Sequence, residues 1–279
     1  MVIDPKVLAY YEQGRERFLE GLKALLRIPS ISALPEHKGD VRRAADFLAD
    51  ELRAMGVENV RLVEGSGHPI ILGERNDAPG KPTLALYGHY DVQPPDPLDE
   101  WKSPPFEPAV RGDNLYARGA VDDKGQVATF LEALRAWHDA TGAPAGGVRF
   151  TVLLEGEEES GSVNLERFVA KHKALLADCA VCLISDTGML GRDKPAITYG
   201  VRGLAYTEVI LHAADQDLHS GMWGGRCPNP ISELTKVLAQ LWDANRHVTI
   251  PEFYEGVREL SPAERNAWAN LGFNQIDAL

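Results

Sequence analysis

Cysteine, positive charge and long apolar runs are all scarce in this chain of 279 residues. The three cysteines are an odd number, so no disulfide framework is expected and a reducing, cytoplasmic compartment is the default. The N-terminus lacks the apolar segment of a signal peptide. No apolar run approaches the roughly 20 residues of a membrane-spanning helix, so no membrane partner is expected.

Positive charge is in deficit, with 29 Lys and Arg against 41 Asp and Glu and a formal net charge of -12. An acidic surface repels phosphate backbones, which disfavours nucleic acid as a partner. The surplus carboxylates have two uses that composition alone leaves open: most aid solubility, and a few can bind cations.

Two of the cysteines, Cys179 and Cys182, form a C-x-x-C pattern. A zinc ribbon would need a second such pair, and Cys227 stands alone far along the chain. The intervening and following residues are apolar. These cysteines are therefore expected to be small apolar side chains on a buried strand over residues 180–184.

Helical and strand-like patterns alternate through the first 200 residues, which predicts a layered α/β fold. Six prolines make residues 94–108 irregular. The character changes near residues 200–203, where two glycines flank Arg202 and a second domain is expected to begin. The expected helices cover residues 7–26, 41–55, 124–140, 164–176 and 230–242, and the expected strands cover 60–63, 69–73, 83–88, 148–154, 180–184 and 204–211.

Four clusters of acidic or histidine residues each follow one of the strand-like runs or stand in the next loop. They lie at residues 88–91, 122–125, 157–160 and 185–186. Loops at the carboxyl edge of an α/β sheet meet in space, and such sheets place their sites there. One histidine with several carboxylates is a ligand set for a divalent metal, so a hydrolytic metal centre is the leading interpretation.

Each cluster also has a plainer interpretation. His89 and Asp91 are compatible with a surface histidine and its partner, and the doublet Asp122–Asp123 with the N-cap of a helix beginning at Lys124. The acidic run at residues 157–159 is compatible with a solvated turn, and a lone His219 with a structural role. A single cluster of this kind is readily explained by chance, whereas four of them at four strand ends are not.

Five segments, in order, resemble the dinuclear zinc peptidases related to ArgE, DapE and glutamate carboxypeptidase, above all the carnosine-type dipeptidase branch. The segments are YGHYDVQP at 87–94, ARGAVDDKG at 117–125, LEGEEESGS at 154–162, ISD at 184–186 and DLHSG at 217–221. The resemblance implies a mixed, mostly parallel sheet flanked by helices. Residues 1–200 would form the catalytic domain, and residues 201–279 the first part of an α+β lid and dimerisation domain.

The resemblance also implies two divalent metal ions, zinc in the first place with manganese or cobalt as alternatives. His89 and Asp186 would bind one ion and Glu159 the other, and Asp122 would bridge them. The peptide bond between Asp122 and Asp123 is expected to be cis.

Three further residues receive roles from the same resemblance. Glu158 would be the general base, Asp91 the partner that holds His89, and His219 a group that reaches the substrate or its oxyanion in the other subunit of a homodimer. The implied reaction is cleavage of a dipeptide or short peptide by a water shared between the two ions. Deacylation of an N-acyl amino acid by the same groups is the enzymatic alternative.

The family pattern continues beyond what this chain contains. Members are longer, return to complete the sheet and supply a late histidine ligand, whereas no histidine follows His247 here. The chain is therefore expected to be C-terminally truncated, with one metal short of a ligand. A third interpretation follows from this, namely a non-catalytic remnant that binds metal or dimerises.

Overall fold

The computed structural model describes residues 3–76, 78–142, 147–191 and 194–272. The chain divides into two compact units, Met1–Gly188 and Met189–Leu279. Within the described residues, no helix combines the length and the apolar character needed to cross a bilayer.

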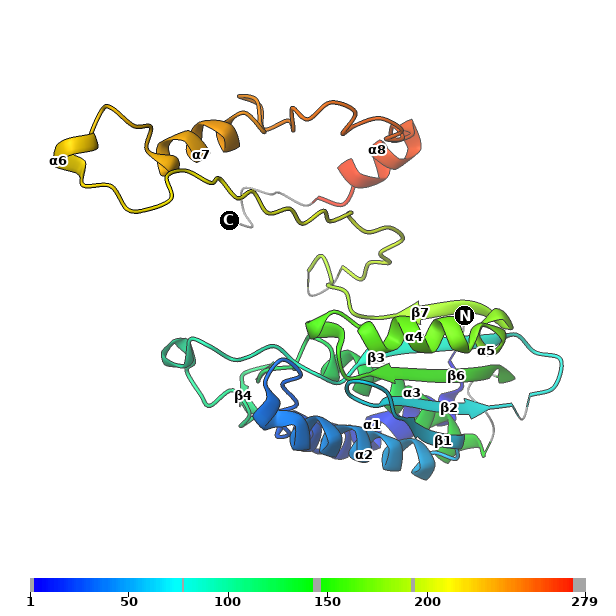
Figure 1. Ribbon diagram of the computed structural model, residues 1–279. Coiled ribbons are helices and arrows are strands. Elements are labelled where there is room, and N and C mark those ends of the chain that lie inside the picture. Colours follow the sequence, from blue (N-terminus) through cyan, green and yellow to red (C-terminus); the bar gives the residue numbers. More distant parts are fainter. Residues whose placement is uncertain (1–2, 77, 143–146, 192–193, 273–279) are drawn as a thin grey trace. The chain divides into compact units, whose positions relative to one another are not determined.

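The first unit is built on a five-stranded sheet with the order β1-β2-β6-β3-β7 (Figure 1). Strand β3 lies parallel to both of its neighbours, whereas β2 runs antiparallel to β1 and β6. This confirms the predicted mixed, mostly parallel sheet. The strands are β1 (Glu58–Val63), β2 (Ile70–Arg75), β3 (Thr83–His89), β6 (Arg149–Glu155) and β7 (Cys179–Ile184), and a separate hairpin joins β4 (Ala109–Arg111) to β5 (Asn114–Tyr116).

Helices cover both faces of this sheet, as Figure 1 shows. Because side chains alternate across a strand, Ile70 and Leu72 of β2 face one core and Ile71 faces the other. The larger core packs under α1, α2 and α3, and the smaller one under α4 and α5. The helices are α1 (Pro5–Leu26), α2 (Lys38–Ala54), α3 (Lys124–Thr141), α4 (Val163–Lys171) and α5 (Lys173–Ala177).

Two expectations for the first unit are corrected. The helix expected over residues 164–176 is divided into α4 and α5 at His172. The strand predicted over residues 180–184, which was expected to be buried, is exposed. It is β7, an edge strand whose one neighbour in the sheet is β3. Cys182 is exposed and Cys179 half-buried, and both are free thiols.

The second unit contains α6 (Ser220–Trp223), α7 (Pro230–Ala239) and α8 (Pro262–Ala269). Helix α7 confirms the predicted helix, and the Asn229 side chain accepts hydrogen bonds at its first turn. The prediction of a strand over residues 204–211 is wrong. No strand pairs with this segment among the described residues, and Leu204 is 95% exposed. The expected role of this unit as a lid stays a prediction.

Candidate metal centre

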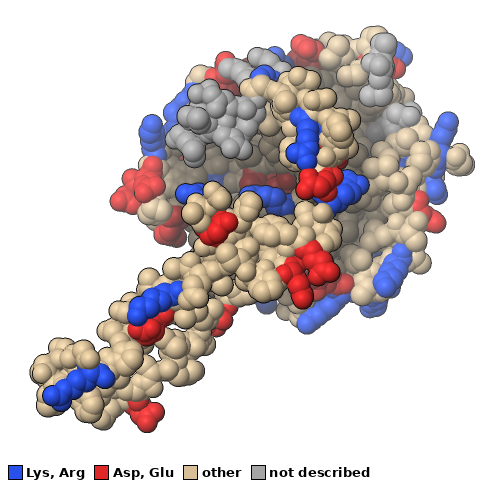
Figure 2. Space-filling view, turned by 90° about the horizontal axis from the view of Figure 1, so that it is seen from above, with Lys and Arg blue, Asp and Glu red and all other residues tan. Residues whose placement is uncertain are grey.

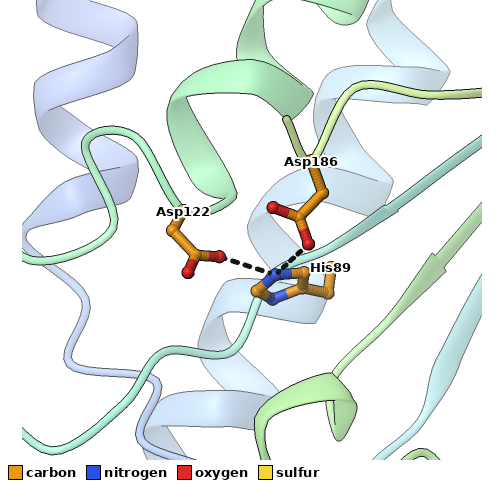
Figure 3. A group of neighbouring side chains, drawn as sticks. All are labelled: His89, Asp122 and Asp186. Carbon is orange, nitrogen blue, oxygen red and sulfur yellow. Dashed lines mark hydrogen bonds and ion pairs between the residues drawn. The ribbon is translucent and has the colours of Figure 1, made fainter. Parts of the chain in front are cut away.

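His89, at the last position of β3, lies between the carboxylates of Asp122 and Asp186 (Figure 3). Its Nε2 atom is 3.0 Å from Asp122 Oδ1 and 3.7 Å from Asp186 Oδ2. Both spacings fall within the roughly 4 Å that separate two ligand atoms of one ion when each bond is about 2 Å. One imidazole and two carboxylates thus fit a divalent cation such as zinc.

The topology of the sheet explains why these three residues meet. Strands β3 and β7 are parallel neighbours, so their carboxyl ends bring His89 and Asp186 to the same edge. Asp122 stands in the turn that leads into α3, and α3 packs against β3. The peptide bond between Asp122 and Asp123 is cis, as predicted.

Asp91 is fully buried and holds two parts of the site at once. Its Oδ1 lies 3.3 Å from His89 Nδ1, and its two carboxylate oxygens accept hydrogen bonds from the backbone N–H groups of Glu158 at 3.2 Å and Glu159 at 3.1 Å. Burial alone would lower the pKa of His89, but the hydrogen bond to Asp91 and the negative charges of Asp91, Asp123 and Glu158 together outweigh it and raise that pKa to about 10. This geometry orients the imidazole with Nε2 toward Asp122 and Asp186.

Asp123 occupies the N-cap position of α3, as the plainer interpretation of the doublet expected, but its side chain accepts no hydrogen bond from the first turn of the helix. Its Oδ2 instead accepts a hydrogen bond from the backbone N–H of His89 at 3.1 Å, and burial raises the pKa of Asp123 to about 7. A Cβ atom at Gly88 would lie 2.8 Å from that oxygen and 2.5 Å from Val127. Gly88 therefore makes room for the contact that fixes the backbone of His89.

Glu158 and Glu159 lie in a short 3-10 turn that follows β6. Burial raises the pKa of Glu158, which moves this carboxylate toward the range useful to a base. The carboxylate of Glu159 accepts a hydrogen bond of 2.8 Å from Gln93 Nε2 and stands outside the group of His89, Asp122 and Asp186. The structure thus brings three predicted ligands together and ties the fourth to a glutamine.

His219 belongs to the second unit and stands at the start of α6. Its Nδ1 accepts a hydrogen bond of 3.0 Å from the backbone N–H of Gly221, and the residue is exposed. A role toward the substrate of another subunit stays a prediction.

Three residues around the site were given no role by the sequence analysis, although Gln93 and Lys124 lie within the segments that resemble the family. Gln93 and Gln126 contact the segments that hold the carboxylates. Lys124 is fully buried, and its Nζ donates hydrogen bonds to the carbonyls of Leu25 and Ile28 at the end of α1. Lys124 thereby anchors the start of α3, directly after the acidic doublet, to the first helix.

The model of the peptidase family M20/M25/M40 matches residues 85–269, which include every candidate site residue named above. The chain belongs to this family. Among its curated M20 relatives, the Cys-Gly metallodipeptidase DUG1 of Candida albicans is 35% identical over 94% of this chain and 57% of its own length. The human Beta-Ala-His dipeptidase is 34% identical over 94% of this chain and 54% of its own length.

Solved M20 structures agree with the fold. An M20 family metallo-carboxypeptidase of Sulfolobus solfataricus, Sso-CP2, superimposes with a TM-score of 0.82 at 35% identity, covering 94% of this chain and 58% of its own. Human carnosine dipeptidase 1 gives a TM-score of 0.78 at 31% identity, covering 98% and 59%. The chain thus spans less than two thirds of the length of each of these relatives.

Proposed function

We propose that this chain is a metal-dependent dipeptidase, which hydrolyses the peptide bond of dipeptides or short peptides with a water shared by two metal ions. The observation that carries the proposal is the grouping of His89, Asp122 and Asp186 at the carboxyl edge of the sheet of an M20 member. Both curated relatives described above are named as dipeptidases, which favours peptides over N-acyl amino acids as substrates.

The proposed ligands divide between two ions. His89 and Asp186 would hold one ion, Glu159 the other, and Asp122 would bridge them. When bound, two such ions supply a Lewis acid and a water of lowered pKa. Zinc suits the mixture of imidazole and carboxylate ligands, with manganese or cobalt as alternatives.

The protein's own groups would handle the proton and the orientation. Glu158 would take the proton from the attacking water and deliver it to the leaving amine. Asp91 supports this role because it fixes the backbone N–H groups of Glu158 and Glu159 and holds the His89 ring. His219 would hold the substrate or its oxyanion.

A substrate panel tests the proposal. The chain is stripped with a chelator, reloaded with Zn²⁺, Mn²⁺ or Co²⁺, and incubated with Cys-Gly, β-Ala-His and an N-acetyl amino acid. We expect metal-dependent release of free amino acids from a dipeptide and no release of acetate. Acetate release alone would mean a deacylase, and one weakly bound ion without any turnover would mean a non-catalytic metal-binding chain.

Three further proposals concern the surroundings of the enzyme. We place it in the cytoplasm, as a homodimer formed through residues 201–279, without nucleic-acid partners. The face in Figure 2 carries Asp and Glu interspersed with Lys and Arg, and the net charge is -12, which together supply no continuous basic surface for a phosphate backbone there. Light scattering coupled to size exclusion, with and without residues 201–279, tests the dimer.

A further inference from the structure

Gln126, in the first turn of α3, bridges the two loops that carry Asp122 and Asp186. Its Nε2 donates a hydrogen bond of 2.8 Å to the carbonyl of Val121, the residue before Asp122. Its Oε1 accepts a longer hydrogen bond of 3.4 Å from the backbone N–H of Thr187, the residue after Asp186. One amide group thus spans two ligand-bearing segments that lie more than sixty residues apart in sequence.

Gln93 makes the corresponding contact to the other proposed ligand. Its Nε2 donates to Glu159 Oε2 at 2.8 Å and to the Glu159 carbonyl at 3.3 Å. The same amide therefore touches both the backbone and the carboxylate of Glu159. One oxygen of the Glu159 carboxylate is engaged in this way.

A glutamine amide is suited to this task because it holds a carboxylate, as Gln93 does, or the backbone beside one, as Gln126 does, without neutralising the negative charge. A lysine or arginine at either position would form an ion pair and compete with the cation for the same oxygens. The side chains of Asp122 and Asp186 are 59% and 34% exposed, so little packing restrains them. Contacts of the glutamines with the backbone beside these ligands reduce the conformational freedom that the carboxylates would lose on binding metal.

We infer that Gln126 and Gln93 are positioning residues for two different metal ions, Gln126 through Asp122 and Asp186, and Gln93 through Glu159. This inference rests on the proposed two-metal function. Gln93 is exposed and Gln126 half-buried, and neither belongs to a hydrophobic core. Removing either amide should therefore leave the fold intact.

The test replaces each glutamine with methionine, which keeps the length of the side chain and removes its hydrogen bonds. The full chain of each variant is stripped of metal and titrated with Zn²⁺ by calorimetry, with far-UV circular dichroism and thermal unfolding of the metal-free form. We expect Gln126→Met to weaken chiefly the binding of the ion at His89, with a smaller effect on the other ion because Asp122 would bridge both. Gln93→Met should weaken only the binding of the ion at Glu159, and each main effect should be about 10- to 100-fold. Unfolding of the metal-free chain should not change.

Two further variants and a control identify the binding events. His89→Ala should remove the event that Gln126→Met weakens, and Glu159→Ala the event that Gln93→Met weakens. Gln240→Met is the matched control, because Gln240 donates to the carbonyl of Lys236 within the second unit. It should leave both events unchanged.

Three results would overturn the inference or its basis. If both variants weaken the same event most strongly, or neither weakens any, the glutamines do not position separate ions. If both weaken both events together with a loss of thermal stability, their role is structural. If the wild-type chain binds fewer than two ions, the two-metal proposal itself fails and the assignment of Gln93 fails with it.

Discussion

At the scale of single residues, the Asp91 carboxylate connects the segments that follow two strands of the sheet. Asp91 follows β3 and contacts the His89 ring. Its carboxylate also accepts hydrogen bonds from the backbone N–H groups of Glu158 and Glu159, in the turn after β6. Asp91→Asn keeps the size but replaces one acceptor oxygen with a donor that faces these N–H groups or the ring. We expect metal affinity to fall by about 10- to 100-fold, measured by titration with a competing chelator. Unchanged affinity would mean that Asp91 does not support the ligands.

Glu158 is proposed as the general base and not as a metal ligand, so its replacement should separate activity from metal binding. Glu158→Ala should lower kcat for a dipeptide by about 100- to 10,000-fold, the usual contribution of a general base. Metal content, measured by atomic emission on the purified variant, should stay at the wild-type value. Loss of metal together with activity would show that Glu158 is a ligand and that the base is elsewhere.

The sequence predicted the residues whose chemical type is informative at a strand end, and missed those that act through an ordinary amide. The clusters of imidazole and carboxylate groups after strand-like runs indicated a metal site, and the family resemblance singled out His89, Asp122 and Asp186 within them. Gln126 and Gln93 make contacts to atoms 61 and 66 residues away, and no local pattern marks such a contact. The position of Asp123 at the N-cap of α3 was expected, but the hydrogen bond of its carboxylate with the backbone of His89 was not.

At the scale of elements, apolar runs predicted strands correctly where the sheet buries them. The central strand β6 is buried along almost its whole length, as its near-continuous apolar sequence indicated. The same reasoning failed for β7, because an apolar run does not reveal how many neighbouring strands it has. It failed for residues 204–211 for a related reason, since a strand exists only with a pairing partner.

The exposed edge of β7 leads to a prediction about aggregation. Val181 is 49% and Ile184 54% exposed on this edge strand, and such edges pair with other chains. Val181→Lys should slow aggregation of the chain severalfold, measured by light scattering, and change the free energy of unfolding by no more than about 0.5 kcal/mol. Val169→Lys on α4 is the control, because Val169 is also exposed. Equal slowing by both variants would mean that net charge, and not the edge, is responsible.

At the scale of the whole molecule, buried apolar side chains are unequally distributed between the two units. The buried hydrophobic residues of the described chain all lie in the first unit, from Val7 to Phe168. In the described part of the second unit, large side chains such as Trp223, Trp242 and Trp268 are 46%, 53% and 52% exposed. A unit without a buried core gains little free energy from folding alone, so we expect its backbone hydrogen bonds to be weakly protected.

This contrast predicts different responses of the two units to metal. Because the candidate ligands lie in residues 89–186, zinc at about 100 times its Kd should stabilise the first unit by about 2.7 kcal/mol. Hydrogen exchange measured by mass spectrometry should show slow exchange in β3 and β6 that zinc slows further. Amides of the described residues 194–272 should exchange fast with and without zinc. Protection of these residues equal to that of β6 would contradict the prediction and require the second unit to bury apolar surface in solution.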